Sequence, residues 1–204
     1  MHNDLEKFSR NYKSTEGKGL HKGTGYFRIY NELFSEFRDK EIVVVEMGIG
    51  YGGCLQMWRE YFGAKAQIYG LDFHTERFYE EDRIKCIQCD QSKPEDLAKI
   101  GNLIPKIDIF IDDGSHVGWH QVLTFKAIFP LIASQGYYCC EDIACNYRAG
   151  YEGGYLQENT FVEYCKHFPD TNNYTEDKRM VQENALAQAY YLAFYDGLIV
   201  ARKK

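Results

Sequence analysis

The sequence has no apolar run that approaches the ~18–20 residues needed to cross a membrane. It has no excess of positive charge either, because it contains 24 Lys and Arg residues and 30 Asp and Glu residues, which gives a net charge of −6. A nucleic-acid partner is therefore not expected, since such binding depends on neutralising phosphates. The first residues, MHNDLEKFSRNYKS, lack the hydrophobic region of a signal peptide, which predicts a cytoplasmic protein.

A second cysteine pair at zinc-site spacing is also missing. Cys86 and Cys89 form a C-x-x-C, but no further pair follows, and the total of seven cysteines is odd. Cys139 and Cys140 are neighbours in a predicted strand, so their side chains should point to opposite faces of the sheet. We interpret the cysteines as small buried apolar residues, with a zinc or redox site as the alternative.

Short apolar strands that alternate with helical patterns are present along most of the chain. Residues 14–25 are rich in glycine and charge and predict a loop, and an aromatic stripe at helical spacing follows through residue 37. The predicted strands are EIVVV, AQIYGLD, RIKCIQCD, KIDIFIDD and GYYCCED, and a hairpin turns at Asp196-Gly197. This pattern predicts one α/β domain over residues 1–204, with a loop and helix in 1–38 and a core in 41–204. The core should be a doubly wound, mostly parallel sheet that ends in an antiparallel hairpin.

Acidic residues follow these predicted strands repeatedly. In an open parallel sheet the ligand binds at the carboxyl ends of the strands, so acids there are candidates for a site. The structural alternative is that each acid caps the next helix. The residues concerned are Glu46, Asp72, Asp90, Asp112, Asp113, Glu141 and Asp142.

A glycine-rich turn follows the first strand. Gly48, Gly50 and Gly53 satisfy G-x-G-x-x-G, which fits NAD or S-adenosylmethionine because glycine lets a ligand approach the backbone. Asp72 is placed to bind ribose hydroxyls of either cofactor. Glu46 before the glycines and Asp90 after the third strand, together with the closing hairpin, favour S-adenosylmethionine.

With these motifs the chain resembles the class I S-adenosylmethionine-dependent methyltransferases, which have a Rossmann-like fold. More narrowly, EMGIGYGG, CDQS, IDDGSH and CCEDI resemble the metal-dependent sugar O-methyltransferases of the macrocin and mycinamicin group. The resemblance implies a cytoplasmic enzyme of natural-product biosynthesis that acts on a glycosidic small molecule and forms a homo-oligomer. It implies Mg²⁺ or another hard divalent cation at Asp113, Glu141 and Asp142, and His116 as the general base. For the cofactor it implies Glu46, Gly48, Gly50, Asp72, Asp90, Ser92 and Asp112.

The residue types fit this chemistry. Three carboxylates make an all-oxygen site suited to Mg²⁺, and a cation there would make a bound sugar hydroxyl more acidic. A histidine, with an unperturbed pKa near ~6.5, suits proton removal at neutral pH. His120, four residues beyond His116, is interpreted as a packing or hydrogen-bonding residue, with metal binding as the alternative. An NAD-linked oxidoreductase, a hydroxylase-like enzyme on the same fold and a non-catalytic binding domain remain alternative functions.

Overall fold

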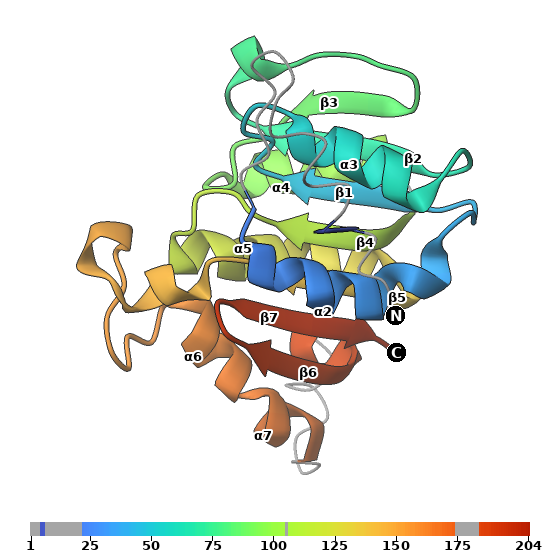
Figure 1. Ribbon diagram of the computed structural model, residues 1–204. Coiled ribbons are helices and arrows are strands. Elements are labelled where there is room, and N and C mark those ends of the chain that lie inside the picture. Colours follow the sequence, from blue (N-terminus) through green and yellow to red (C-terminus); the bar gives the residue numbers. More distant parts are fainter. Residues whose placement is uncertain (1–4, 7–21, 105, 174–183) are drawn as a thin grey trace. The chain divides into compact units, whose positions relative to one another are not determined.

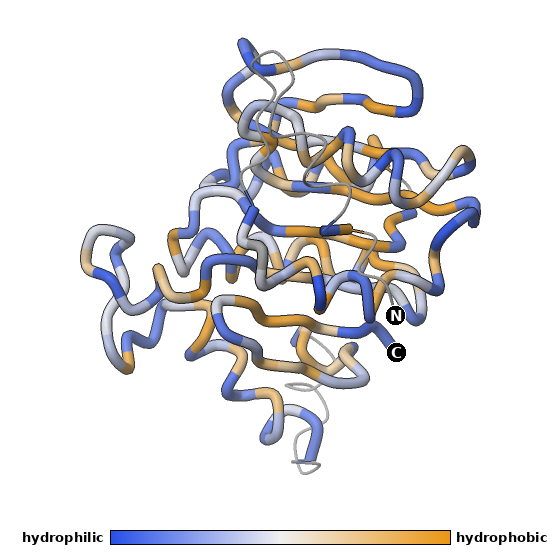
Figure 2. Tube along the Cα trace, in the orientation of Figure 1, coloured by the Kyte–Doolittle hydropathy of each residue, from blue (hydrophilic) through white to orange (hydrophobic). Residues whose placement is uncertain are grey.

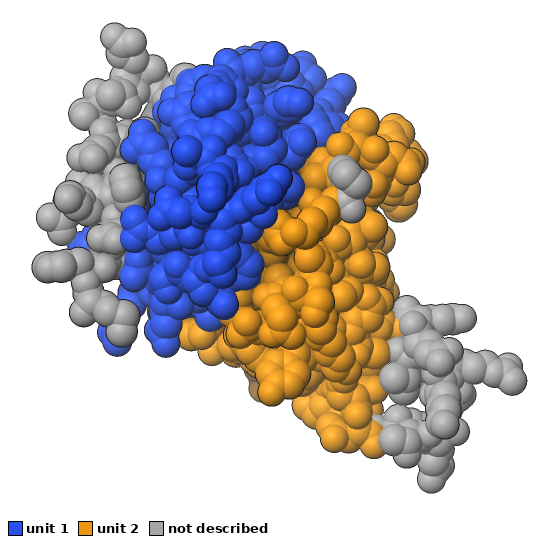
Figure 3. Space-filling view, turned by 90° about the vertical axis from the view of Figure 1, so that its right-hand side faces the viewer, with its two compact units in different colours: residues 1–88 blue, residues 89–204 orange. Residues whose placement is uncertain are grey.

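The computed structural model describes residues 5–6, 22–104, 106–173 and 184–204 (Figure 1). Most of the predicted loop at residues 14–25 lies outside these residues. Contacts divide the chain into two compact units, Met1–Gln88 and Cys89–Lys204 (Figure 3). The single domain expected from the sequence stays a prediction, and the two units are described in turn.

The described residues of unit 1 form three parallel strands in the order β3-β2-β1. Strand β1 is continuously apolar except for Glu46, as expected for a strand buried on both faces. The predicted strand that ended at Asp90 stops two residues earlier, because the chain turns after Gln88. The described elements are α2 (Thr24–Phe34), η1 (Ser35–Phe37), β1 (Val43–Met47), α3 (Gly53–Phe62), β2 (Gln67–Asp72), η2 (Thr75–Arg77) and β3 (Ile84–Gln88).

Aromatic rings pack helix α2 against helix α3. Tyr30 and Phe34 are fully buried and meet Trp58 with ring centroids 5.6 and 6.1 Å apart, in edge-to-face geometry. Phe62 continues the cluster at 5.9 Å from Phe34. Each such ring buries a large apolar area, so these positions of the aromatic stripe pack in the core.

In the described part of unit 2, four strands lie in the order β4-β5-β7-β6. Strands β4 and β5 are parallel, whereas β7 is antiparallel to both β5 and β6. The described elements are α4 (Pro94–Leu103), β4 (Ile107–Asp112), α5 (Gly118–Ile128), η3 (Phe129–Leu131), β5 (Ile132–Cys140), η4 (Ile143–Tyr147), η5 (Ala149–Tyr151), α6 (Phe161–Lys166), α7 (Phe168–Asn173), η6 (Ala185–Gln188), β6 (Ala189–Tyr195) and β7 (Leu198–Lys203).

Strand β4 is buried at every position, and Figure 2 shows its hydrophobic stretch. Tyr138 of β5 packs on Phe125 of α5 and Phe161 of α6, with centroids 5.0 and 6.1 Å apart. The predicted hairpin is confirmed, since Tyr195 pairs with Leu198 and Gly197 has the positive φ of 73° that such a turn requires. The α/β class, with parallel strands and a terminal antiparallel hairpin, is therefore confirmed.

All seven cysteines are free thiols, and six of them are buried. Cys86 is half-buried, and its thiol contacts the carbonyl oxygen of Tyr79. Burial raises the pKa of Cys89 to about 12, so this thiol is protonated at neutral pH. These observations confirm the interpretation of the cysteines as buried small residues for six of the seven. Among the described residues, no helix is long and apolar enough to cross a membrane.

Candidate functional site

The ends of strands β4 and β5 bring together three side chains that could bind a metal ion. The two strands pair in parallel, with Asp112 opposite Cys140, so the residues that follow each strand emerge at the same edge. Asp113, His116 and Asp142 each present a ligand atom, and these atoms lie within 4.8 Å of one another. The Nε2 atom of His116 lies 3.6 Å from an Oδ atom of Asp142.

Two members of this group have left-handed backbone conformations. His116 has a φ of 59° and Asp142 a φ of 52°, a region that residues other than glycine rarely adopt. Each such residue costs on the order of 1–3 kcal/mol in unfavourable backbone energy, and strain of this kind is often found at functional sites. Here the left-handed turns direct the chain so that Asp113, His116 and Asp142 converge.

The turn between Asp113 and His116 is braced by a buried hydrogen-bond network. Asp112 is fully buried and accepts hydrogen bonds from the amide of Gln91 and the hydroxyl of Tyr138, both at 2.6 Å. The side-chain oxygen of Gln91 in turn accepts from the backbone N–H of Ser115 at 2.9 Å. Asp112 therefore anchors the turn from inside unit 2, and its contact with the cofactor stays a prediction.

Gln91 and Tyr138 were missed by the sequence analysis. Gln91 lies between two residues that were singled out, and Tyr138 was seen only as part of an apolar strand. The signal that could have found them is the buried carboxylate of Asp112, because a buried charge requires hydrogen-bond donors nearby. Nothing in the spacing of the sequence identifies which donors these are.

His116 lies beside a second aromatic side chain. The rings of His116 and Tyr151 lie edge-to-face, with their centroids 6.2 Å apart. The Nδ1 atom of His116 is buried and has no hydrogen-bond partner among the described residues. His120 lies outside the metal-binding group and contacts the hydroxyl of Ser115 through Nδ1 at 2.7 Å. The interpretation of His120 as a hydrogen-bonding residue is thus confirmed.

Glu141, the third carboxylate implied by the resemblance, is placed differently from Asp113 and Asp142. It is only 1% exposed, and its backbone N–H donates to the carbonyl oxygen of Asp112 at 2.9 Å. Its carbonyl oxygen accepts from the side chain of Gln121 at 3.3 Å. Among the described residues, the group that could hold one ion contains His116 in place of Glu141, so metal binding by Glu141 stays a prediction.

In unit 1 the glycine-rich turn is held by the carboxylate of Asp72. One oxygen of Asp72 accepts from the backbone N–H of Ile49, inside the turn, at 3.1 Å, and the other accepts from the N–H of His74 at 2.8 Å. Gly48 and Gly50 have φ values of 85° and 52°, which a residue with a side chain adopts only under strain. Asp72 thus supports the glycine-rich turn, and its contact with the ribose hydroxyls stays a prediction.

Glu46 forms a buried ion pair with a residue that the sequence analysis did not consider. The ammonium of Lys22 lies 3.0 Å from Glu46, and both side chains are fully buried. The ammonium also lies 5.9 Å from the centre of the Trp58 ring, a favourable position for a cation. A direct contact of Glu46 with the cofactor stays a prediction.

In unit 2, Asp90 and Ser92 interact with each other. Asp90 accepts hydrogen bonds from the N–H of Ser92 at 3.0 Å and from its hydroxyl at 2.7 Å, and it pairs with Lys93 at 2.9 Å. The Ser92 hydroxyl, followed by Lys93, lowers the pKa of Asp90 to about 2. Asp90 therefore carries its charge at any working pH and can accept hydrogen bonds from a ligand.

The buried state of Asp112 predicts a measurable pH dependence of stability. Burial raises its pKa to about 6 in the folded chain, against about 3.9 for an exposed aspartate. The folded chain therefore takes up this proton more readily than the unfolded chain. The stabilisation that protonated Asp112 gives to the folded chain is fully present below about pH 4 and is lost as the pH rises through about 6.

We expect the free energy of unfolding of the wild-type protein to gain about 2–3 kcal/mol relative to Asp112→Asn between pH 7.5 and pH 4. Urea unfolding of both proteins across this range, with a chelator present, measures the difference. If the free energies of unfolding of the two proteins change in parallel with pH, the raised pKa of Asp112 is contradicted.

Known proteins resemble this chain in sequence and structure. The FtsJ-like methyltransferase model matches residues 29–169. An O-methyltransferase of rhamnosyl tetracenomycin from Streptomyces olivaceus is 34% identical over 78% of this chain and 43% of its own length. Mycinamicin VI 2''-O-methyltransferase from Micromonospora griseorubida is 36% identical over 74% of this chain and 38% of its own. The chain thus spans about two fifths of the length of these curated relatives.

A solved structure extends the similarity to nearly the whole chain. The MycE methyltransferase of the mycinamycin pathway, solved with Mg, SAH and mycinamycin VI, superposes with a TM-score of 0.83 at 28% identity. The match covers 98% of this chain and 53% of MycE. The fold class and the resemblance inferred from the motifs are confirmed, and with more than half of its residues matched, the chain belongs to the FtsJ-like methyltransferase family.

Proposed function

We propose that the chain catalyses transfer of a methyl group from S-adenosylmethionine to a hydroxyl of a sugar or glycosylated natural product, with a divalent metal ion. The observation that carries this proposal is the convergence of Asp113, His116 and Asp142 at the ends of two parallel strands. Membership of a methyltransferase family supports the reaction type. The names of the relatives, which act on glycosylated natural products, support the acceptor class.

The donor atoms of the group fit a hard divalent cation. Asp113 and Asp142 offer carboxylate oxygens, the ligands that Mg²⁺ prefers, and Glu141 follows β5 directly before Asp142. When bound, the cation would acidify an acceptor hydroxyl that it contacts. We assign the three carboxylates to metal binding and leave the imidazole for another role, because nitrogen is a poor ligand for Mg²⁺.

His116 is then the residue that removes the proton from the acceptor hydroxyl. Its Nε2 faces Asp142, so the acceptor oxygen would be held at the metal-binding group beside this nitrogen. The hydrogen bond from the Ser115 N–H to Gln91 holds the turn that carries His116. Fixing the base before the acceptor arrives lowers the entropic cost of reaching the reactive geometry.

The cofactor contacts are proposed from the turns that follow the strands. In unit 1 we assign Glu46, Gly48, Gly50 and Asp72, and in unit 2 Asp90 and Ser92, with Asp112 as a residue that supports them. Gly48 and Gly50 let the ligand approach the backbone, and Asp72 and Asp90 can accept hydrogen bonds from hydroxyl groups. The full burial of Asp112 favours support of its neighbours over direct contact. Cytoplasmic location and a homo-oligomer stay predictions.

Mass spectrometry of methyl transfer tests the proposed function. The chain would be incubated with S-adenosylmethionine, Mg²⁺ and either p-nitrophenyl α-L-rhamnoside or a panel of other aryl glycosides. Growth of a singly methylated glycoside with equal formation of S-adenosylhomocysteine is the expected result. Binding of NAD in preference to S-adenosylhomocysteine, with no methylated product, would contradict the proposal.

Metal dependence should map to the converging carboxylates. We expect Asp113→Asn and Asp142→Asn to weaken Mn²⁺ binding at least tenfold, because each removes a charged oxygen ligand. Glu141→Gln tests the third predicted ligand, and Asp82→Asn, on an exposed side chain in unit 1, is the control. Electron paramagnetic resonance titration gives the affinities. Chelation should stop turnover and leave S-adenosylhomocysteine binding intact, whereas full turnover without metal would exclude this mechanism.

Asp72 should contribute to cofactor binding. We expect Asp72→Ala to weaken S-adenosylhomocysteine binding by about 1–3 kcal/mol, since it removes a charged acceptor and the support of the Ile49 N–H. Isothermal calorimetry measures the loss, and Asp170→Ala serves as a control far along the chain. Unchanged affinity in Asp72→Ala would show that the cofactor binds elsewhere.

Loss of His116 should act on turnover more than on binding. We expect His116→Ala to lower kcat by ~10²–10⁴-fold and to change the affinity for S-adenosylhomocysteine little, as expected for a general base. The wild-type rate should rise with pH through one ionisation that is missing in the variant. A Mn²⁺ titration of the same variant separates the two possible roles. If His116→Ala binds Mn²⁺ more weakly and its rate keeps the wild-type dependence on pH, then His116 is a metal ligand and not the general base.

A further inference from the structure

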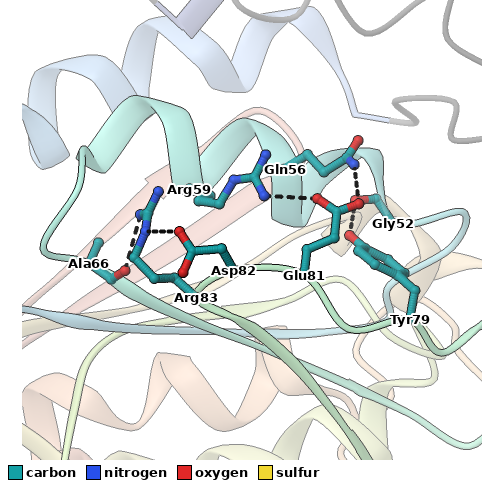
Figure 4. A network of polar contacts seen from close by, with 8 residues as sticks. All are labelled: Gly52, Gln56, Arg59, Ala66, Tyr79, Glu81, Asp82 and Arg83. Atoms are coloured by element: carbon teal, nitrogen blue, oxygen red, sulfur yellow. Dashed lines mark hydrogen bonds and ion pairs between the residues drawn. The ribbon is translucent and has the colours of Figure 1, made fainter.

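A segment between β2 and β3 lies along helix α3 from its first residues to its last. The hydroxyl of Tyr79 donates to the carbonyl oxygen of Gly52, directly before the helix, at 2.7 Å. At the other end, Arg83 donates to the carbonyl oxygen of Gly63, directly after the helix, at 2.8 Å. Residues 79–83, which we name the clasp, therefore hold both ends of the helix, and Figure 4 shows the contacts of Tyr79 and Glu81 with Gly52, Gln56 and Arg59.

The middle of the clasp is fixed by Glu81. Its two carboxylate oxygens accept from Gln56 at 2.7 Å and from Arg59 at 2.8 Å. Gln56 and Arg59 lie four and seven residues beyond Gly52, so all three contacts fall on one face of the helix. The Arg59 and Glu81 side chains are 21% and 24% exposed, which limits screening of their ion pair by water.

Tyr79 packs directly on the glycine-rich turn. A Cβ atom at Gly52 would lie 2.2 Å from the Tyr79 ring, and Gly52 has a φ of 82°. The ring thus occupies the space that the missing side chain leaves. Burial raises the pKa of Tyr79 well above its ordinary value, so its hydroxyl stays a hydrogen-bond donor at any working pH.

The same turn is closed by its own backbone. The N–H of Gly52 donates to the carbonyl oxygen of Ile49 at 2.7 Å, and the N–H of Ile49 donates to Asp72. The turn is therefore held at its start by Asp72 and at its end by Tyr79. Neither the Gly52 carbonyl nor the Tyr79 hydroxyl is part of the proposed set of cofactor contacts.

We propose that Tyr79 is a positioning residue for S-adenosylmethionine. It acts through Gly52 and keeps residues 48–52 in the conformation that binds the cofactor, without touching the cofactor itself. This inference rests on the proposed function, because it concerns the turn assigned there to cofactor binding. A turn that must find this conformation anew at each binding event would bind the cofactor less tightly.

Tyr79→Phe tests the proposal, since it removes the hydroxyl and retains the ring. We expect the Kd for S-adenosylhomocysteine in calorimetry to rise about three- to tenfold, the effect of one net hydrogen bond. Glu81→Gln, which keeps the hydroxyl and weakens only the middle of the clasp, should raise Kd less. Tyr190→Phe, on a side chain that is 68% exposed in β6, is the matched control and should leave Kd unchanged.

Two further measurements on the ligand-free proteins separate positioning from stability. Amide hydrogen exchange should become faster at residues 49–52 in Tyr79→Phe, and the Tm of each variant should be recorded beside its Kd. A lower Tm with unchanged Kd and unchanged exchange in the turn would overturn the proposal and make Tyr79 a residue of general stability. If the wild-type protein does not bind S-adenosylhomocysteine, the proposed function fails, and the positioning role fails with it.

Discussion

The buried carboxylate of Asp112 is the constraint on which the candidate site depends. An unpaired carboxylate in a protein interior is strongly unfavourable, so its two oxygens must be supplied with donors. Tyr138 supplies one from the neighbouring strand, and Gln91 supplies the other from the turn after β3. Because Gln91 also accepts from Ser115, satisfying the carboxylate determines where Asp113 and His116 lie.

A similar arrangement recurs in unit 1 with different atoms. Asp72, at the end of β2, binds two backbone N–H groups and thereby shapes the glycine-rich turn after β1. In both units an acid that ends a strand is used to hold a loop. The loop, rather than the acid itself, then presents its groups to a ligand. This explains how several acids can follow strands in one chain while only some of them are exposed to solvent.

The sequence predicted the order of strands and helices well, because hydrophobic periodicity and turn-forming residues are local properties of the chain. Asp196-Gly197 specified its hairpin, and the aromatic stripe before residue 37 specified a buried helix face. It also placed Asp113, His116 and Asp142 among the candidates. It did not reveal the roles of Gln91, Tyr138 or Tyr79, because each depends on a partner far along the chain. The burial of Glu141 and Asp112 likewise follows from packing that no local pattern encodes.

The ion pair between Lys22 and Glu46 has a consequence for shortened versions of the chain. Both groups are cut off from water, so each is the counter-charge that makes the burial of the other tolerable. A version that begins after residue 22 would keep the carboxylate inside strand β1 and lose its cation. Such a fragment would bury the Glu46 charge with less compensation, so the boundary chosen for expression affects the stability of strand β1.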